Sequence, residues 1–185
     1  MSTTGLNQDP DPRSAVLRSA IEAHTPRDEA ELRSCEELLE ALHRLPAPFD
    51  EDADPTHVTG AAIVTDGDHA IVLHRHKRLG IWLQPGGHVA PGEDPAQAAK
   101  RETREETGLE ASHPGGVPRL LHIDAHPGPR GHRHLDVRYL MVADRTASFA
   151  PAEGESPHVA WFSLAEAIEV ADTSLASALR ALWDD

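Results

Sequence analysis

Apolar residues recur at helical spacing near the start of the chain. Between residues 30 and 45 they follow the three-to-four-residue period of an amphipathic helix. The apolar positions are Ala30, Leu32, Cys35, Leu38, Leu39, Leu42 and Leu45. This pattern predicts a helical extension over residues 11–45, after a disordered tail at 1–10 and before an acidic, proline-broken linker at 46–56.

Capping residues predict where the helices of this extension begin. Asp11-Pro12 is typical of a helix N-terminus, because the fixed φ of proline suits the first helical position. The first helix is therefore expected to run to about His24. Thr25-Pro26 repeats the pattern, with Asp28 three residues after the threonine, and predicts the start of the second helix.

After the linker the pattern changes to short aliphatic and β-branched runs. The runs 57–65 and 69–76 are separated by Asp66-Gly67-Asp68, which predicts a β-hairpin. Further strands are predicted at 81–83, 117–126, 132–143 and 159–162. Helices are predicted at 95–107, from Ser163, and from Asp172 or Thr173, the last with Leu175, Leu179, Leu182 and Trp183. Mixed strands around a central helix predict an α/β sandwich over residues 57–185.

Composition narrows the class of protein. The 185 residues suit one domain with an appendage, and the net charge of -14 argues against unspecific binding to nucleic acid or to an anionic membrane. The single cysteine, Cys35, excludes an intrachain disulfide and the cysteine-rich zinc motifs. Without a membrane-length apolar run or a signal-peptide core, we expect a cytoplasmic protein. The 13 histidines are many for this length.

The central helix carries its boundaries in the sequence. Asp94 suits the N-cap, Pro95 suits the first helical position, and Gln97 completes a capping box. Gly108 stands where a left-handed residue is expected to end the helix.

Three glutamates of this helix share one face. Glu102, Glu105 and Glu106 are spaced i, i+3 and i+4, so their like charges repel unless a cation lies among them. Hard oxygen ligands suit magnesium, with manganese as an alternative. The competing interpretation is a solvated acidic face paired with neighbouring basic residues. Arg101, four residues before Glu105, is placed to pair with that carboxylate.

The stretch from Gly87 to Leu109 matches the pattern G-x5-E-x7-R-E-U-x-E-E-x-G-U, in which U is aliphatic. The fixed residues are Gly87, Glu93, Arg101, Glu102, Glu105, Glu106, Gly108 and Leu109. The one departure is Thr103 at an aliphatic position, which keeps the β-branching. The chain therefore resembles the Nudix hydrolase family, over about residues 57–183 and without the N-terminal helices.

The resemblance implies an α/β/α sandwich that hydrolyses a nucleoside diphosphate linked to another moiety with the help of magnesium. Carried over by position, Glu102, Glu105, Glu106 and the Gly87 carbonyl would bind metal, and Arg101 would orient the glutamates. The metal would activate a water molecule, whose proton a carboxylate would take. Glu102 is one candidate for this base, and Glu155, six residues before Trp161, is the other. A surface acid in a loop is the competing interpretation of Glu155.

Two further segments are candidates for substrate binding. Arg75, Lys77 and Arg78 precede the glycine loop at Gly86-Gly87 and could contact phosphates of a substrate. The competing interpretation is that their positive charges only offset the negative net charge of the chain. Two predicted strands carry polar residues at alternate positions: His122, Asp124 and His126 on one, and His134, Asp136 and Arg138 on the other. If the strands pair, the polar faces meet as a phosphate-binding wall, a second metal site or a hydrated surface. Among these residues His122, His134 and Arg138 are the expected substrate contacts.

Alternatives to a pyrophosphohydrolase are open at the level of function. A Nudix-fold regulator without turnover usually lacks part of the signature, whereas every carboxylate is present here. An isoprenoid isomerase on the same fold needs a cysteine in the core domain, and Cys35 lies in the N-terminal helices. Those helices could cap the cleft or form a homodimer interface. The expected partner is a small nucleotide-type substrate, with no nucleic acid and no membrane.

Overall fold

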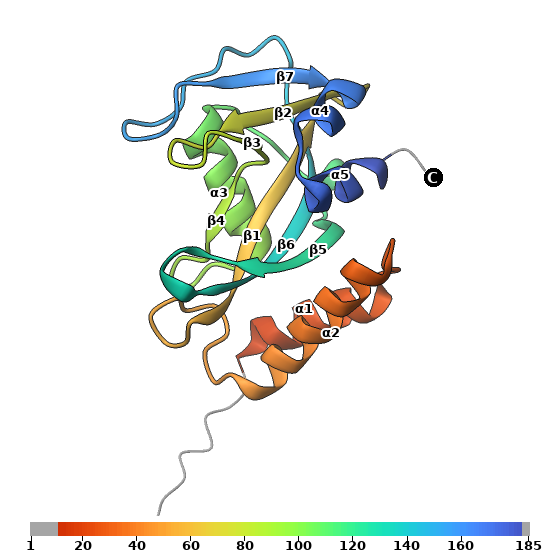
Figure 1. Cartoon of the computed structure of the whole chain (residues 1–185), viewed down its shortest axis with the longest axis vertical. Helices are drawn as coiled ribbons and strands as arrows, with labels where there is room; N and C mark the ends of the chain where they lie inside the picture. The colour runs from red at the N-terminus through yellow and green to blue at the C-terminus, as the bar shows by residue number, and fades with distance from the viewer. Residues whose placement is uncertain (1–10, 183–185) are drawn as a thin grey trace, which may run out of the picture.

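A mixed seven-stranded sheet forms the centre of the molecule in the computed structural model, which describes residues 11–182 (Figure 1). The strands are β1 (Thr56–Thr65), β2 (Ala70–Arg75), β3 (Trp82–Leu83), β4 (Gly86–His88), β5 (Arg119–Pro127), β6 (Arg133–Val142) and β7 (Val159–Ser163). The α-helices are α1 (Pro12–Ala23), α2 (Glu29–Arg44), α3 (Pro95–Thr107), α4 (Leu164–Val170) and α5 (Thr173–Arg180). The order is β3-β2-β1-β6-β5, while β4 pairs with β1 and β7 pairs with β2. The pairing of β1 with β6 is parallel and the other pairings are antiparallel.

The alternation of β1 side chains gives the sheet two apolar faces. Val58, Ala62 and Val64 pack in one core with the small residues of α3, whereas Ile63 packs in the other core with α4 and α5. Figure 1 shows α3 on one side of the sheet and α4 and α5 on the other. The start of α3 approaches closely, because the Pro95 carbonyl occupies the place that a side chain at position 60, a glycine, would need. The predicted α/β sandwich is confirmed.

The N-terminal helices lie beside the edge strand β5 (Figure 1). The Glu31 carboxylate accepts a hydrogen bond from the Ile123 amide at 3.0 Å, and the Ser34 hydroxyl accepts one from the Ala125 amide at 3.1 Å. Leu38 of α2 is fully buried in the same core as the sheet. Helix α2 therefore supplies the hydrogen-bond acceptors that a further strand would otherwise provide.

Several predicted boundaries differ from those of the structure. Helix α2 begins at Glu29, because the Asp28 carboxylate rather than Thr25 caps it by accepting from the amides of Ala30 and Glu31. Strand β4 was not predicted, and Phe49 in the predicted linker is buried. The predicted tail at 1–10 and Trp183 lie outside the described residues. Within residues 11–182, no helix is long and apolar enough to cross a membrane.

Candidate active site

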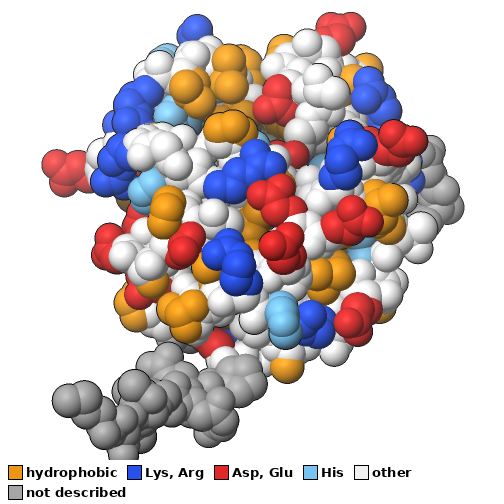
Figure 2. Space-filling model, turned by 60° about the horizontal axis from the view of Figure 1, so that its bottom comes forward, with side chains coloured by type: hydrophobic (Ala, Val, Ile, Leu, Met, Phe, Trp, Pro, Cys, Tyr) orange, Lys and Arg blue, Asp and Glu red, His pale blue; other side chains and the backbone are white. Residues whose placement is uncertain are grey.

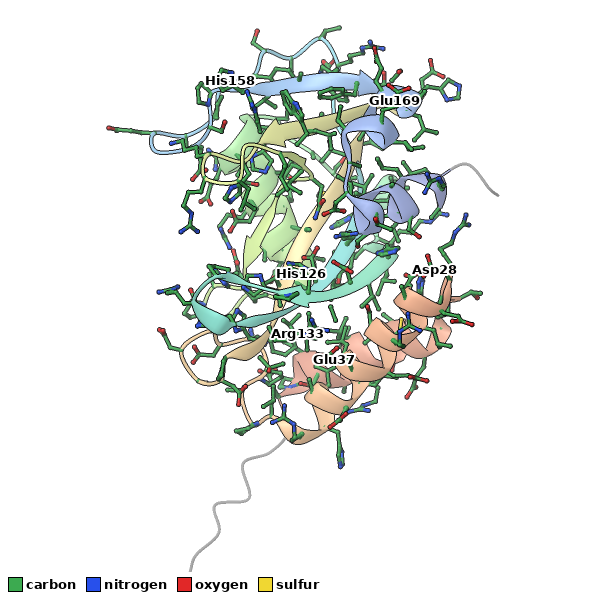
Figure 3. All side chains as sticks on the ribbon, viewed as in Figure 1. Asp28, Glu37, His126, Arg133, His158 and Glu169 are labelled. Atoms are coloured by element: carbon green, nitrogen blue, oxygen red, sulfur yellow. The ribbon has the colours of Figure 1, made fainter. Side chains whose placement is uncertain are left out.

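A cleft of about 1580 Å³ opens where α3 and the loop before it face the β5–β6 hairpin. Glu102, Glu106 and the backbone of Gly86 and Gly87 line one wall. His126, His134 and Asp136 line the wall formed by the hairpin, and His74, His76 and Arg78 come from β2 and the loop after it. Figure 3 labels His126 near the end of β5. The cleft thus gathers residues that lie far apart in the sequence.

Helix α3 has the boundaries that its capping residues predicted. Asp94 accepts from the Gln97 amide at 2.8 Å, and the Gln97 side chain accepts from the Asp94 amide at 2.8 Å. Gly108 ends the helix with a φ of 76°, and the backbone of Ala150 leaves no room for a side chain there. These contacts fix the phase of the helix and so the direction of its glutamates.

Glu102 and Glu106 lie against the glycine strand β4. The Glu106 Oε2 atom accepts a hydrogen bond from the Gly86 amide at 2.9 Å and lies 3.5 Å from His74 Nε2. The Glu102 carboxylate fills the space that a Cβ atom at Gly87 would occupy. A side chain at position 87 would therefore displace the Glu102 carboxylate from this close approach.

Burial makes the charged forms of Glu102 and Glu106 unfavourable and so raises the pKa of both carboxyl groups. It raises the pKa of Glu106 to about 8, and the charges of Glu102, Glu155 and Glu105 add to the effect. Burial also raises the pKa of Glu102, against the opposing influence of Arg101. A group of buried oxygen donors that resists ionisation is suited to a divalent cation, which would favour the charged forms.

Arg101 connects the glutamates to the loop. Its guanidinium bonds Glu93 at 2.9 Å, Glu102 at 2.7 Å, Glu105 at 2.9 Å and the His88 carbonyl at 2.8 Å. These carboxylates raise the pKa of Arg101, with Glu93 as the largest cause. The predicted pair with Glu105 is present, and Glu93 proves to be a second anchor for the same arginine.

Two of the predicted catalytic acids lie at the margin of this cluster. Glu105 has 46% of its side chain exposed and borders a groove on the outer side of α3 rather than the cleft. Glu155 is exposed in the loop before β7, and its charge raises the pKa of both Glu102 and Glu106. It therefore lies on the glutamate side of the cleft without lining it.

The structure separates the three predicted basic contacts. Arg78 lines the cleft together with His76. The Arg75 side chain instead donates to the Gly80 carbonyl at 3.0 Å, and Lys77 donates to the Gly154 carbonyl. Arg75 and Lys77 thus hold loops together outside the cleft lining.

The two polar strand faces meet as predicted, but only part of them reaches the cleft. Strands β5 and β6 pair His122 with Arg138, Asp124 with Asp136, and His126 with His134. His122 and Arg138 are 3% exposed and lie outside the cleft lining, toward α2 and α5. Of the three expected contacts on this face, only His134 lines the cleft.

Sequence reasoning missed three histidines of this region: His57, His74 and His88. Each stands in or beside a strand, where a histidine by itself gives no functional signal. Only strand pairing shows that His57 and His88 face the same side as His134. The contact with Glu106 places His74 beside the glutamates of α3 instead. Cys35 is buried in α2, and burial raises the pKa of its thiol to about 11, so it is not placed as a nucleophile.

Residues 55–182 match the family model of the NUDIX domain, which covers more than half of the chain. The chain belongs to the Nudix family. The Nudix signature is the segment that builds the glutamate wall of the cleft, from Gly87 through α3 to Leu109. The Nudix fold places this helix on one face of the sheet, and the N-terminal helices precede the matched region.

Relatives and solved structures agree with this assignment. The chain is 64% identical over 42 residues to a mouse asymmetrical bis(5'-nucleosyl)-tetraphosphatase, covering 23% of this chain and 29% of that protein. It is 29% identical over 142 residues to a human 8-oxo-dGDP phosphatase, covering 74% of this chain and 38% of that protein. The chain thus spans well under two thirds of both relatives. A Nudix-family hydrolase structure from Clostridium perfringens aligns with a TM-score of 0.58 and 25% identity, over 68% of this chain and 95% of that one.

Proposed function

We propose that this Nudix chain is a magnesium-dependent pyrophosphohydrolase that cleaves a phosphoanhydride bond in a nucleotide substrate. The observation that supports it best is the convergence of Glu102 and Glu106 on the Gly86-Gly87 backbone inside a cleft. Arg101 stabilises this arrangement. A solvated acidic face would leave these carboxylates exposed, whereas 17% of Glu102 and 12% of Glu106 are exposed.

The donor set fits a hard divalent cation. Glu102, Glu106 and the Gly87 carbonyl would hold it in the cleft, with Glu105 joining from the outer side, and all of these offer oxygen. Manganese is the alternative metal. When bound, such a cation neutralises the diphosphate and lowers the pKa of a water molecule.

The remaining steps are assigned to side chains of this chain. Arg101 would orient Glu102, because its guanidinium is itself fixed by Glu93. Glu102 and Glu155 are the two carboxylates proposed to take a proton from the attacking water. Arg78 and His134, which line the cleft, would bind phosphate or base edges of the substrate.

A small nucleotide suits the cleft better than a nucleic acid does. The face shown in Figure 2 carries acidic, basic and hydrophobic side chains interspersed, without a continuous basic surface. The net charge of -14 also disfavours a polyanion. The printed activities of the relatives, on dinucleoside tetraphosphates and on an oxidised guanine nucleotide, make these two substrate classes the first to test.

The test is hydrolysis of a substrate panel with magnesium or manganese. The panel contains canonical and oxidised nucleoside triphosphates, 8-oxo-dGDP, dinucleoside polyphosphates, nucleotide sugars and ADP-ribose, and released products are quantified. We expect metal-dependent turnover that Glu106→Gln and Glu105→Gln reduce by about 100-fold or more. Glu106→Gln should fold normally, because burial already favours the uncharged form of this side chain.

Glu169→Gln is the matched control, since this exposed glutamate lies on α4 (Figure 3). It should hydrolyse the substrate at the wild-type rate. Nucleotide binding without turnover on the whole panel, equal in wild type and Glu106→Gln, would instead favour a ligand-binding regulator.

A further inference from the structure

Three histidines from neighbouring strands converge beside the glycine loop. His57 on β1 pairs in register with His134 on β6, and His88 on β4 pairs with Thr59, the next β1 residue on the face of His57. One ring nitrogen of each histidine lies within 4.8 Å of the other two. The ring centroids of His57 are 5.1 Å from those of His88 and His134.

One nitrogen of each histidine in this cluster has no hydrogen-bond partner within residues 11–182. The Nε2 atoms of His57, His88 and His134 are buried without a hydrogen bond. Glu51 lies 3.4 Å from His88 Nε2 but forms no hydrogen bond with it. A buried polar atom without a partner loses its hydrogen bond to water and so destabilises the folded chain. Three neighbouring histidines that each keep an unpartnered buried nitrogen are a reason to look for a ligand between them.

His57 is held in the form that a metal ligand requires. Its side chain is completely buried, and its Nδ1 atom lies 3.2 Å from the Asp54 carbonyl. Because a carbonyl only accepts hydrogen bonds, the Nδ1 atom carries the proton and Nε2 keeps a free lone pair. A backbone carbonyl in this position is typical of the groups that orient metal-bound histidines.

We infer that His57, His88 and His134 bind one Zn²⁺ ion or a similar transition-metal ion. This site is separate from the glutamates of α3. Three imidazoles without a thiolate suit zinc, whereas magnesium prefers oxygen. Nitrogens bound tetrahedrally at about 2.1 Å lie about 3.4 Å apart, so modest ring rotations would complete the site. His132, whose ring centroid is 5.1 Å from that of His57, also has a buried, unpartnered Nδ1 atom and is a candidate for a fourth ligand.

The position of the site connects it to the cleft. His88 and His134 line the cleft, whereas His57 is fully buried and does not line it, so the proposed ion would lie at the wall of the cleft. His88 directly follows Gly87, and its carbonyl accepts a hydrogen bond from Arg101 at 2.8 Å. A bound ion would therefore stabilise the loop that carries the Gly87 carbonyl.

The experiment measures metal binding directly, with no substrate present. Bound metal is first removed from tag-free full-length protein with a chelator. Binding of Co²⁺ is then followed by visible absorption, and binding of Zn²⁺ is measured by calorimetry. We expect one tightly bound equivalent with the absorption of a four-coordinate nitrogen site, distinct from any binding at the carboxylates of Glu102 and Glu106. His88→Gln and His134→Gln should each weaken Zn²⁺ binding more than about 100-fold, since even groups that only support a ligand contribute about 10–100-fold.

His158→Gln is the matched control, because this exposed histidine lies just before β7, away from His126 and the cleft hairpin (Figure 3). It should bind like wild type, and so should Glu106→Gln. Two results would overturn the inference: no Zn²⁺ or Co²⁺ binding by wild type, or binding that Glu106→Gln abolishes while His88→Gln retains it. Circular dichroism of each variant confirms that the fold is intact, and both readouts are independent of hydrolysis.

Discussion

Arg101 shows how one side chain can organise a site. Its planar guanidinium reaches Glu93, Glu102, Glu105 and the His88 carbonyl at the same time. The pair with Glu105 followed from helical spacing alone. The contacts to Glu93 and His88 could not be predicted from spacing, because they depend on how the loop folds back over the helix.

Replacing Arg101 with lysine should disrupt this arrangement. A lysine keeps the charge but offers a single ammonium group, which cannot satisfy the four separated acceptors. We expect Arg101→Lys to lower kcat/KM on any substrate found by about 10–100-fold, the usual effect of losing a group that supports a metal ligand. Steady-state kinetics with saturating magnesium is the measurement.

Arg104→Lys serves as the comparison on the same helix. Arg104 is 73% exposed and pairs only with Glu110 in the described ion pairs, so this variant should keep wild-type kinetics. Equal losses in both variants would mean that the helix tolerates no lysine, rather than that Arg101 orients the glutamates.

At the scale of helices and strands, elements with local signals were predictable. The capping residues of α3 predicted both ends of this helix, and the Asp-Gly-Asp turn predicted the hairpin of β1 and β2. Strand β4 has no local signal, because it consists of two glycines and a histidine. It exists through pairing with β1, where Gly86 passes so close to Ala61 that a side chain would collide. The cleft wall could not be predicted without this pairing.

The contacts of Glu31 on helix α2 should contribute to the stability of the fold. This buried carboxylate accepts from the amides of Ile123 and Arg27 and lies 2.7 Å from His24 Nε2. Glu31→Ala leaves these donors unpaired, so we expect the free energy of unfolding to fall by about 3 kcal/mol or more. The urea midpoint measures the effect.

Glu29→Ala provides the reference two residues earlier in α2. The Glu29 side chain is 92% exposed, so its loss should change the free energy of unfolding by less than about 0.5 kcal/mol. If Glu31→Ala proved as mild as Glu29→Ala, then α2 would not depend on its contact with β5.

At the scale of the whole molecule, the buried side chain of His122 should make the free energy of unfolding depend on pH. His122 lies where the N-terminal helices meet the sheet. Burial and the nearby Arg138 lower its pKa to about 4, against the opposing charges of Glu31, Asp124 and Asp28. Between pH 6.5 and 4 the unfolded chain therefore binds a proton that the folded chain does not. The free energy of unfolding should fall as the pH falls through this window, by about 3 kcal/mol for this one group.

Chemical denaturation at a series of pH values tests this expectation. His122→Gln cannot titrate and should therefore flatten the decline between pH 6.5 and 4 relative to wild type. An unchanged slope in His122→Gln would assign the acid sensitivity to other groups.

The acceptors that α2 offers to β5 have a consequence for solubility. A sheet edge with free amides is a template on which another chain can add a strand, and such edges promote aggregation. Because Glu31 and Ser34 occupy the Ile123 and Ala125 amides, the N-terminal helices close this edge. We therefore expect that removing the helices that precede the Nudix domain would expose this edge to the addition of strands from other chains.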